Sequence, residues 1–215
     1  MKITRHGHAA VLVEAAGARL LIDPGVFCPD ETFALDGLDA VVITHQHPDH
    51  VDHERLGGLL QRNPGATLLC DPETATVVKA GQWTAHRDGD ATAVEALTIQ
   101  GVGQRHAEIV PAIPRIANTG VLVRADGEPT LFHPGDTYEY APDDVDVLAV
   151  PISAPWAKVA ETVEFVTRVA PRVLFGVHDA TVSPAGLGIY WSHVENFGGV
   201  DDVRRLGPSD TTDVA

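Results

Sequence analysis

The 215-residue chain contains few lysines, and this shortage excludes a class of partner. Its 15 basic side chains stand against 30 acidic ones, which gives a formal charge of −15. Only three of the basic residues are Lys, and the arginines are scattered along the chain. A surface that neutralises phosphate backbones needs clustered Lys and Arg. The composition therefore predicts no nucleic-acid partner.

Long apolar runs are also missing. Charged residues such as Glu14 and Arg19 interrupt the longest early run, and no stretch approaches the roughly 18 to 20 apolar residues that a membrane helix requires. Near the start of the chain, Lys2 and Arg5 stand where a secretory signal needs an apolar core. We therefore expect a cytoplasmic protein with no membrane partner. A homo-oligomer is left open.

Cysteine is scarce as well, since Cys28 and Cys70 are the only two and they form no CxxC pair. In a reducing cytosol two free thiols are the default, and one disulfide between them is the alternative. A chain of this length buries roughly 70% of its unfolded surface. We expect a core that is stable without a disulfide.

Short apolar runs alternate with amphipathic segments along the chain. Several runs, such as Val41–Ile43, lack polar alternation, which is typical of strands buried on both faces. Ser192 and Glu195 have capping-box spacing, so a last helix should begin there and end near Gly207, with a loop before it at 183–188. The other expected helices cover 52–62, 72–81 and 158–170, and the expected strands cover 10–14, 19–23, 40–44, 66–70, 120–124, 130–133, 145–151 and 172–178.

This order of elements predicts an α/β protein in which two sheets pack together with helices outside. No linker, internal repeat or change in composition marks a boundary along the sequence. We therefore expect one domain over residues 1–215.

Histidine is unusually frequent, with 11 residues, and three of them stand close together. His45, His47, Asp49 and His50 fall within six residues directly after an expected buried strand. Imidazole and carboxylate bind Zn²⁺ at roughly 2.0 to 2.2 Å. His45 and His47 share one side of an extended segment, and the other two follow where the chain turns. One loop is thus expected to serve two adjacent cations.

Four clustered ligands do not complete two metal sites, so further ligands should come from other strand ends. His106, Asp136 and His178 each follow an apolar run, at the edge of a sheet where ligands usually bind. His6 and His8 are open to two interpretations. They either line the rim of the site or satisfy backbone groups in a β-hairpin, and we favour the second.

The motifs resemble those of the metallo-β-lactamase superfamily. His45-Gln46-His47-Pro48-Asp49-His50 fits the HxHxDH pattern, and Leu20-Leu21-Ile22-Asp23-Pro24-Gly25 precedes it. A lone His, a Gly-Asp pair and a final His follow in the order of the family, so that the motifs span residues 8 to 178. The sequence of these motifs is most similar to the branch that contains ascorbate-phosphate lactonase and uncharacterised metal-dependent hydrolases.

The resemblance implies a four-layer αβ/βα sandwich with a dinuclear site that usually holds Zn²⁺. By motif, His45, His47 and His106 hold the first metal. Asp49, His50 and His178 hold the second, and Asp136 bridges the two. Asp23 supports the ligand loop without binding metal. Ligation rich in histidine also tolerates Mn²⁺, Fe²⁺ or Ni²⁺.

Two such cations lower the pKa of a shared water to give hydroxide near neutral pH and polarise a carbonyl or phosphoryl oxygen. The expected function is therefore hydrolysis of a small-molecule ester, lactone or phosphoester. Asp49 is the candidate catalytic residue, since it can orient the hydroxide or take its proton. Arg115, Asn118 and Trp156 are candidate substrate contacts near the site.

Two other functions fit the same motifs. One is a phosphodiesterase that acts on RNA or a lipid, because the same metal pair performs that reaction. The other is a non-catalytic metabolite-binding protein on the same fold. The full set of seven ligands argues against the second, since a decayed enzyme usually loses a ligand.

Overall fold

A computed structural model of the protein describes all 215 residues and contains two seven-stranded sheets. The first sheet has the strand order β14-β1-β2-β3-β4-β5-β6, and the second has the order β13-β12-β11-β10-β9-β8-β7. The strands of the first sheet are β1 (Lys2–Arg5), β2 (Val11–Ala15), β3 (Ala18–Ile22), β4 (Ala40–Ile43), β5 (Thr67–Cys70), β6 (Thr84–Ala85) and β14 (Thr211–Asp213). Those of the second are β7 (Ala91–Val94), β8 (Leu97–Val102), β9 (Gly120–Arg124), β10 (Leu131–His133), β11 (Val147–Pro151), β12 (Val173–Val177) and β13 (Asp202–Arg204).

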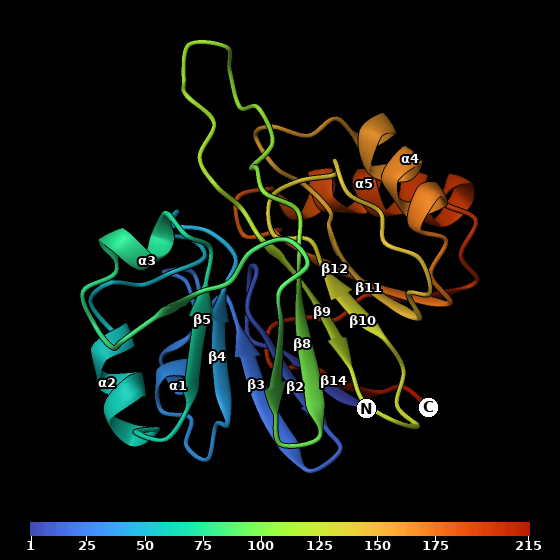
Figure 1. Cartoon of the computed structure of the whole chain (residues 1–215). Helices are drawn as coiled ribbons and strands as arrows, with labels where there is room; N and C mark the ends of the chain where they lie inside the picture. The colour runs from blue at the N-terminus through green and yellow to red at the C-terminus, as the bar shows by residue number, and fades with distance from the viewer.

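The five helices cover the outer faces of the two sheets (Figure 1). They are α1 (Asp30–Phe33), α2 (Leu56–Arg62), α3 (Thr74–Val77), α4 (Val159–Val169) and α5 (Pro184–Phe197). A core of 22 buried apolar residues, drawn from strands of both sheets, lies between the sheets. Two further cores contain 13 buried residues each. One packs helices α1, α2 and α3 against the first sheet, and the other packs α4 and α5 against the second. The α/β sandwich expected from the sequence is therefore confirmed.

The central strands form where the sequence has continuous apolar runs. Every residue of β4, β11 and β12 is buried, because each of these strands has a neighbour on both sides and packs on both faces. β4 pairs in parallel with β3 and β5, and β11 pairs in parallel with β10 and β12. Strands that are buried on both faces have continuous apolar sequences without alternating polar residues, as the sequence predicted.

The C-terminal helix begins earlier than expected. α5 starts at Pro184 and ends at Phe197, whereas the capping-box spacing predicted a start at Ser192. The hydroxyl of Ser183 accepts a hydrogen bond from the Gly186 amide, and Pro184 stands at the first helical position. Proline is favoured there because its missing N–H has no partner in a helix. The prediction of a loop over 183–188 was wrong because this start signal was taken for turn composition.

The structure differs from the sequence-based expectation at two other places. The hairpin of β7 and β8 was not predicted, since alternating small and polar residues give it a weak apolar pattern. The expected helix over 72–81 shrinks to the single turn α3, where Val78 leaves the helix with an extended backbone. None of the helices is both long and apolar enough to cross a bilayer.

One edge of the sandwich collects the ends of several strands. β3 and β4 end there in the first sheet, and β8, β10 and β12 end there in the second, because the pairing within each sheet points them the same way. Both chain termini lie at the opposite edge (Figure 1), where the amino group of Met1 bonds to the carbonyl of Val214. The loops after these strands carry the candidate ligands.

Candidate metal centre

All seven candidate ligands lie together at this edge, in two groups. One group contains His45, His47, His106 and Asp136, and the other contains His8, Asp49, His50 and His178. In each group the ligand atoms lie within 4.8 Å of one another. The strand ends of both sheets therefore bring together residues that are up to 170 positions apart in the sequence.

Asp136 lies between the two groups. Its Oδ1 is 3.1 Å from His50 Nε2, and its Oδ2 is 3.1 Å from His178 Nε2 and 3.3 Å from His106 Nε2. Neighbouring ligand atoms around a tetrahedral Zn²⁺, with bonds of about 2.0 to 2.1 Å, lie roughly 3.3 Å apart. These spacings fit a carboxylate that two cations share.

In three of the histidine rings, a hydrogen bond at one nitrogen leaves the other nitrogen free for a cation. The Nδ1 atoms of His50, His106 and His178 lie 2.7 Å from Asp23 Oδ2, the Ala107 carbonyl and the Ser153 carbonyl. Each of these partners accepts, so each Nδ1 donates and, in a neutral ring, Nε2 keeps its lone pair.

The freed atoms are buried without a protein partner. Nε2 of His50, His106 and His178, and Oδ1 of Asp136, have no hydrogen bond of acceptable geometry. Buried polar atoms are rarely left unpaired. Four such atoms around one point, all of types that Zn²⁺ accepts, show that these residues fit a divalent cation.

Asp23 fastens the loop that carries four of these residues. Its carboxylate is fully buried and accepts hydrogen bonds from the Thr44 amide, the Thr44 hydroxyl and His50 Nδ1, all at 2.7 Å. Because Thr44 Oγ1 donates to Asp23, it accepts from His45 Nδ1, which lies 3.1 Å away. Asp23 therefore orients His50 directly and His45 through Thr44.

The charges of the centre are strongly coupled. Burial opposes the charged form of Asp136, but the neighbouring His178 and His50 outweigh it and lower the pKa of Asp136. Burial also opposes ionisation of Asp49, but the neighbouring His178 and His8 lower its pKa nevertheless. In turn, Asp136 and Asp49 overcome burial and raise the pKa of His178 to about 10. Both carboxylates are thus ionised near neutral pH.

Other histidines have different surroundings. His133 uses both ring nitrogens on the backbone, since Nε2 lies 2.9 Å from the Ala9 carbonyl and Nδ1 accepts from the Gly135 amide. It supports the turn before Asp136. His86 is buried.

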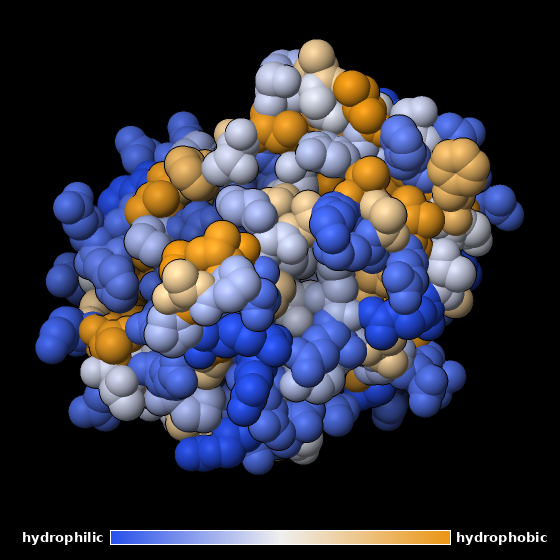
Figure 2. Space-filling model, turned by 90° about the horizontal axis from the view of Figure 1, so that it is seen from above, coloured by the Kyte–Doolittle hydropathy of each residue, from blue (hydrophilic) through white to orange (hydrophobic).

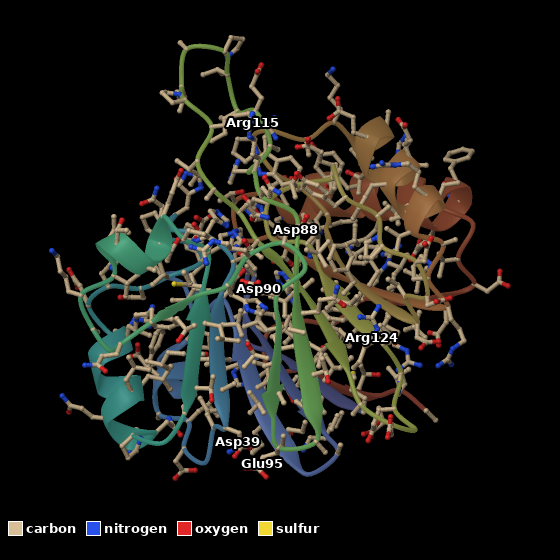
Figure 3. All side chains as sticks on the ribbon, viewed as in Figure 1. Asp39, Asp88, Asp90, Glu95, Arg115 and Arg124 are labelled. Carbon is tan, nitrogen blue, oxygen red and sulfur yellow. The ribbon has the colours of Figure 1, made fainter.

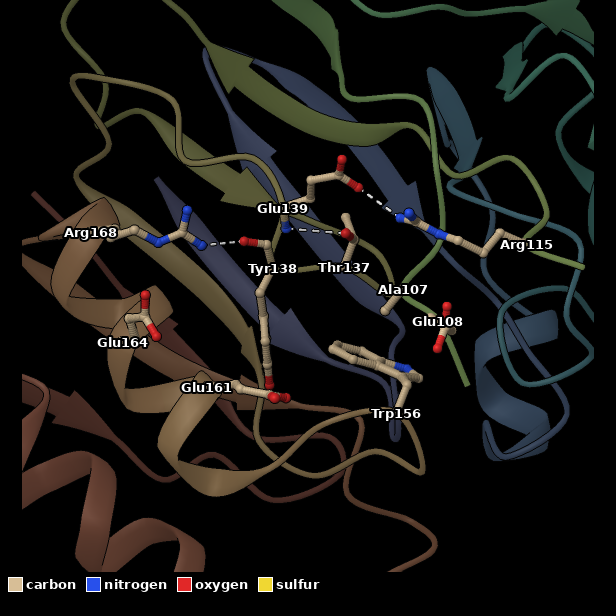
Figure 4. A pocket seen from close by; sticks show the side chains of 10 residues that line it. All are labelled: Ala107, Glu108, Arg115, Thr137, Tyr138, Glu139, Trp156, Glu161, Glu164 and Arg168. Carbon is tan, nitrogen blue, oxygen red and sulfur yellow. Dashed lines mark hydrogen bonds and ion pairs between the residues drawn. The ribbon is translucent and has the colours of Figure 1, made fainter. Parts of the chain in front are cut away.

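Trp156 and Arg115 lie beside the ligands. The Trp156 indole donates to Asp136 Oδ2 at 2.9 Å, and Arg115 pairs with Glu139 at 2.7 Å. Both residues line a cavity of about 340 Å³, in which the indole lies near Ala107 and the Arg115 guanidinium points toward Glu139 (Figure 4). A substrate that reached His106 from this side would pass these two side chains.

Asn118 has a different position from the one expected. Its side chain is fully buried; its Nδ2 donates to the Pro134 carbonyl and its Oδ1 accepts from the Asp136 amide. Both ends of the amide are therefore occupied by the loop that presents Asp136. The prediction of a substrate contact at Asn118 was wrong, because this residue, two positions before the buried strand β9, lies inside the fold.

Apolar side chains flank the centre on two loops. Val26 and Phe27 are 42% and 47% exposed, and Val110 and Ile113 are 45% and 51% exposed. Phe27 packs edge-on against His8, with 5.1 Å between the centres of the two rings. Ile113 lines a small cavity together with His47 and His106. Figure 2 shows this face from above, with groups of orange side chains among blue ones.

Residues 2–178 match the family model of the beta-lactamase superfamily domain. The chain belongs to the metallo-β-lactamase superfamily. The match extends from β1 to the last predicted ligand, His178, and confirms the family expected from the HxHxDH motif.

Three similar proteins each cover most of the chain. Protein Rv0786c of Mycobacterium tuberculosis is 42% identical, over 90% of this chain and 91% of its own length. A UPF0173 metal-dependent hydrolase of Methylobacterium nodulans is 29% identical, over 83% and 84%. The solved structure of Igni18, a metallo hydrolase from Ignicoccus hospitalis, has a TM-score of 0.74 at 23% identity, over 98% and 97%. The last comparison supports the fold.

Proposed function

We propose that this protein is a metal-dependent hydrolase of a small-molecule ester, lactone or phosphoester. The observation that carries the proposal is the pair of ligand groups around Asp136, with three unpaired imidazole nitrogens and an unpaired carboxylate oxygen. His45, His47 and His106 would hold one cation, Asp49, His50 and His178 the other, and Asp136 would contact both. The superfamily assignment and the relatives named metal-dependent hydrolases support this function.

Two bound cations, most simply Zn²⁺, would lower the pKa of a water and polarise the carbonyl or phosphoryl oxygen of the substrate. The protein supplies the orientation. Asp49 is ionised and its carboxylate is partly exposed. It can therefore accept a hydrogen bond from the attacking water and direct the lone pair of the water oxygen toward the substrate. Because its pKa is low it is a weak base, and orientation is its main contribution.

The neighbouring residues determine what can approach. The Trp156 indole forms one wall and fixes Asp136 through its N–H. The guanidinium of Arg115 is held by Glu139 and by the His106 carbonyl, which keeps it at the rim. With a net charge of −15 and no basic stripe, the surface favours small substrates over RNA. A cytoplasmic location remains part of this proposal.

Metal analysis followed by an activity panel tests the proposal. Purified protein should contain divalent metal, and the loaded form should hydrolyse at least one member of a panel of lactones, esters, thioesters and phosphodiesters. A chelator should abolish the activity, and added Zn²⁺ or Mn²⁺ should restore it. His47→Ala should lose activity while His193→Ala, on the exposed face of α5, should keep it. Full activity in the chelated protein would overturn the proposal.

A further inference from the structure

His8 lies within ligand distance of the centre, and proximity alone leaves its role open. Its Nε2 is 3.2 Å from Asp49 Oδ2, and its ligand atom belongs to the same group as those of Asp49, His50 and His178. Its side chain is fully buried. The residue either binds a cation itself or holds the residues that do.

The hydrogen bonds of the ring decide between these roles. The backbone amide of Ala180 donates to His8 Nδ1 at 3.1 Å. A backbone N–H can only donate, so Nδ1 carries the lone pair, and a neutral imidazole then carries its single hydrogen on Nε2. That hydrogen points at Asp49 Oδ2. His50, His106 and His178 have the opposite arrangement, with Nδ1 donating and Nε2 free.

His8 also connects the two sheets. It follows β1 in the turn before β2 of the first sheet, and its carbonyl accepts from the His178 amide at 2.8 Å. His178 directly follows β12 of the second sheet and has a left-handed backbone with φ of 62°. Such a backbone is costly for a residue with a side chain and persists only where neighbours hold it. The carbonyl and Nδ1 of His8 hold the amides on both sides of Asp179.

We infer that His8 is a positioning residue of the metal centre, which fixes the Asp49 carboxylate and the 178–180 segment and does not itself bind metal. This inference rests on the proposed function, since it requires a cation between Asp49, His50 and His178. An oxygen of Asp49 has two lone pairs, so Oδ2 accepts from His8 with one and keeps the other for the cation. Partners of this kind typically change metal affinity by about 10- to 100-fold.

Three substitutions separate the alternatives. His8→Gln keeps a neutral donor and acceptor, His8→Ala removes both, and His8→Phe fills the space without hydrogen bonds. The matched control is His6→Gln, a buried histidine whose Nδ1 contacts Thr32 and not a ligand. Each variant is titrated with Zn²⁺ and with Co²⁺, and its unfolding temperature without metal checks the fold.

We expect two equivalents of metal in the wild type, in His6→Gln and in His8→Gln, with similar affinities and the same Co²⁺ absorption spectrum. In His8→Ala and His8→Phe the second equivalent should bind about 10- to 100-fold more weakly. Loss of the second equivalent in His8→Gln as well, with a changed Co²⁺ spectrum, would show that His8 is a ligand. Unchanged binding in His8→Ala would show that it has no role. A wild type that binds no divalent metal would overturn the proposed function together with the inference.

Discussion

At the scale of single residues, the centre depends on its carboxylates and on the groups that surround them. Asp23 is the clearest case because it is not a ligand and yet accepts three hydrogen bonds from the ligand loop. An ionised acceptor makes stronger hydrogen bonds than a neutral one. Its charge therefore matters as much as its shape.

Asp23→Asn should destabilise the protein by about 1 to 3 kcal/mol, since the amide cannot accept all three bonds and its NH₂ faces donors. Urea unfolding measures the loss. Asp39→Asn is the matched control, because Asp39 Oδ2 accepts one amide, that of Arg19, at the opposite edge (Figure 3). Equal effects in the two variants would contradict the role given to Asp23.

Metal binding should release protons, because the pKa of His178 is raised to about 10 and that of His50 is also raised, by Asp136 and Asp23 against the effect of burial. The His178 ring is therefore protonated near pH 7 in the metal-free protein and must lose a proton to bind a cation, and the raised pKa of His50 acts in the same direction. Metal affinity should therefore rise with pH up to about 10. Calorimetry in two buffers of different ionisation enthalpy should find at least one proton released, and no release would contradict the assignment of these ligands.

At the scale of elements, the ligand loop after β4 packs tightly against the loop after β3. A Cβ on Gly25 would lie 1.9 Å from the Asp49 carbonyl oxygen and 2.6 Å from the His50 amide nitrogen. No side chain fits there without moving the backbone that carries these two residues. The glycine is required by this close approach and not by its backbone angles.

Gly25→Ala should therefore destabilise the protein by at least about 1 to 3 kcal/mol and weaken metal binding at the same time. Gly58→Ala in helix α2 is the control, because a Cβ there meets nothing within 4 Å. Alanine in a helix should stabilise the protein by about 0.5 to 1 kcal/mol. Thermal unfolding and a Zn²⁺ titration check both variants, and an unaffected Gly25→Ala would refute the packing described.

The elements also show what the sequence could predict. Apolar runs such as β4 and β12 and the dense ligand loop were readable, because burial and metal chemistry leave a local pattern. For His8 the sequence favoured a backbone role in a β-hairpin and did not indicate its actual contacts, since these depend on a backbone amide at Ala180, far away in the chain. Asn118 was predicted wrongly because its burial follows from tertiary packing. The start of α5 was predicted wrongly because Ser183 and Pro184, which begin the helix, are also typical turn residues.

At the scale of the whole molecule, two sheets from distant parts of the chain present the ligands at one edge, and apolar loops flank it. Val26 and Phe27 come from the first half, and Val110 and Ile113 from the loop after β8. Exposed apolar side chains next to a reactive centre favour substrates with an apolar portion. The surface is otherwise strongly acidic.

If the protein is an esterase, Ile113→Ser should lower kcat/KM for a hexanoyl ester about fivefold, the equivalent of about 1 kcal/mol of apolar burial. An acetyl ester should be unaffected because it is too short to reach this side chain. Ile189→Ser on α5, where the side chain is 59% exposed against 51% for Ile113, is the control. Equal losses for both esters would contradict a role for this loop in substrate selection.

The central claim is that two cations share Asp136, and native mass spectrometry of the Zn²⁺-loaded protein tests it most directly. The wild type should bind two ions, His106→Ala and His178→Ala should each keep one, and Asp136→Ala should lose affinity at both sites. A wild type that binds a single ion, or an Asp136→Ala variant that binds two with unchanged affinity, would contradict the shared centre.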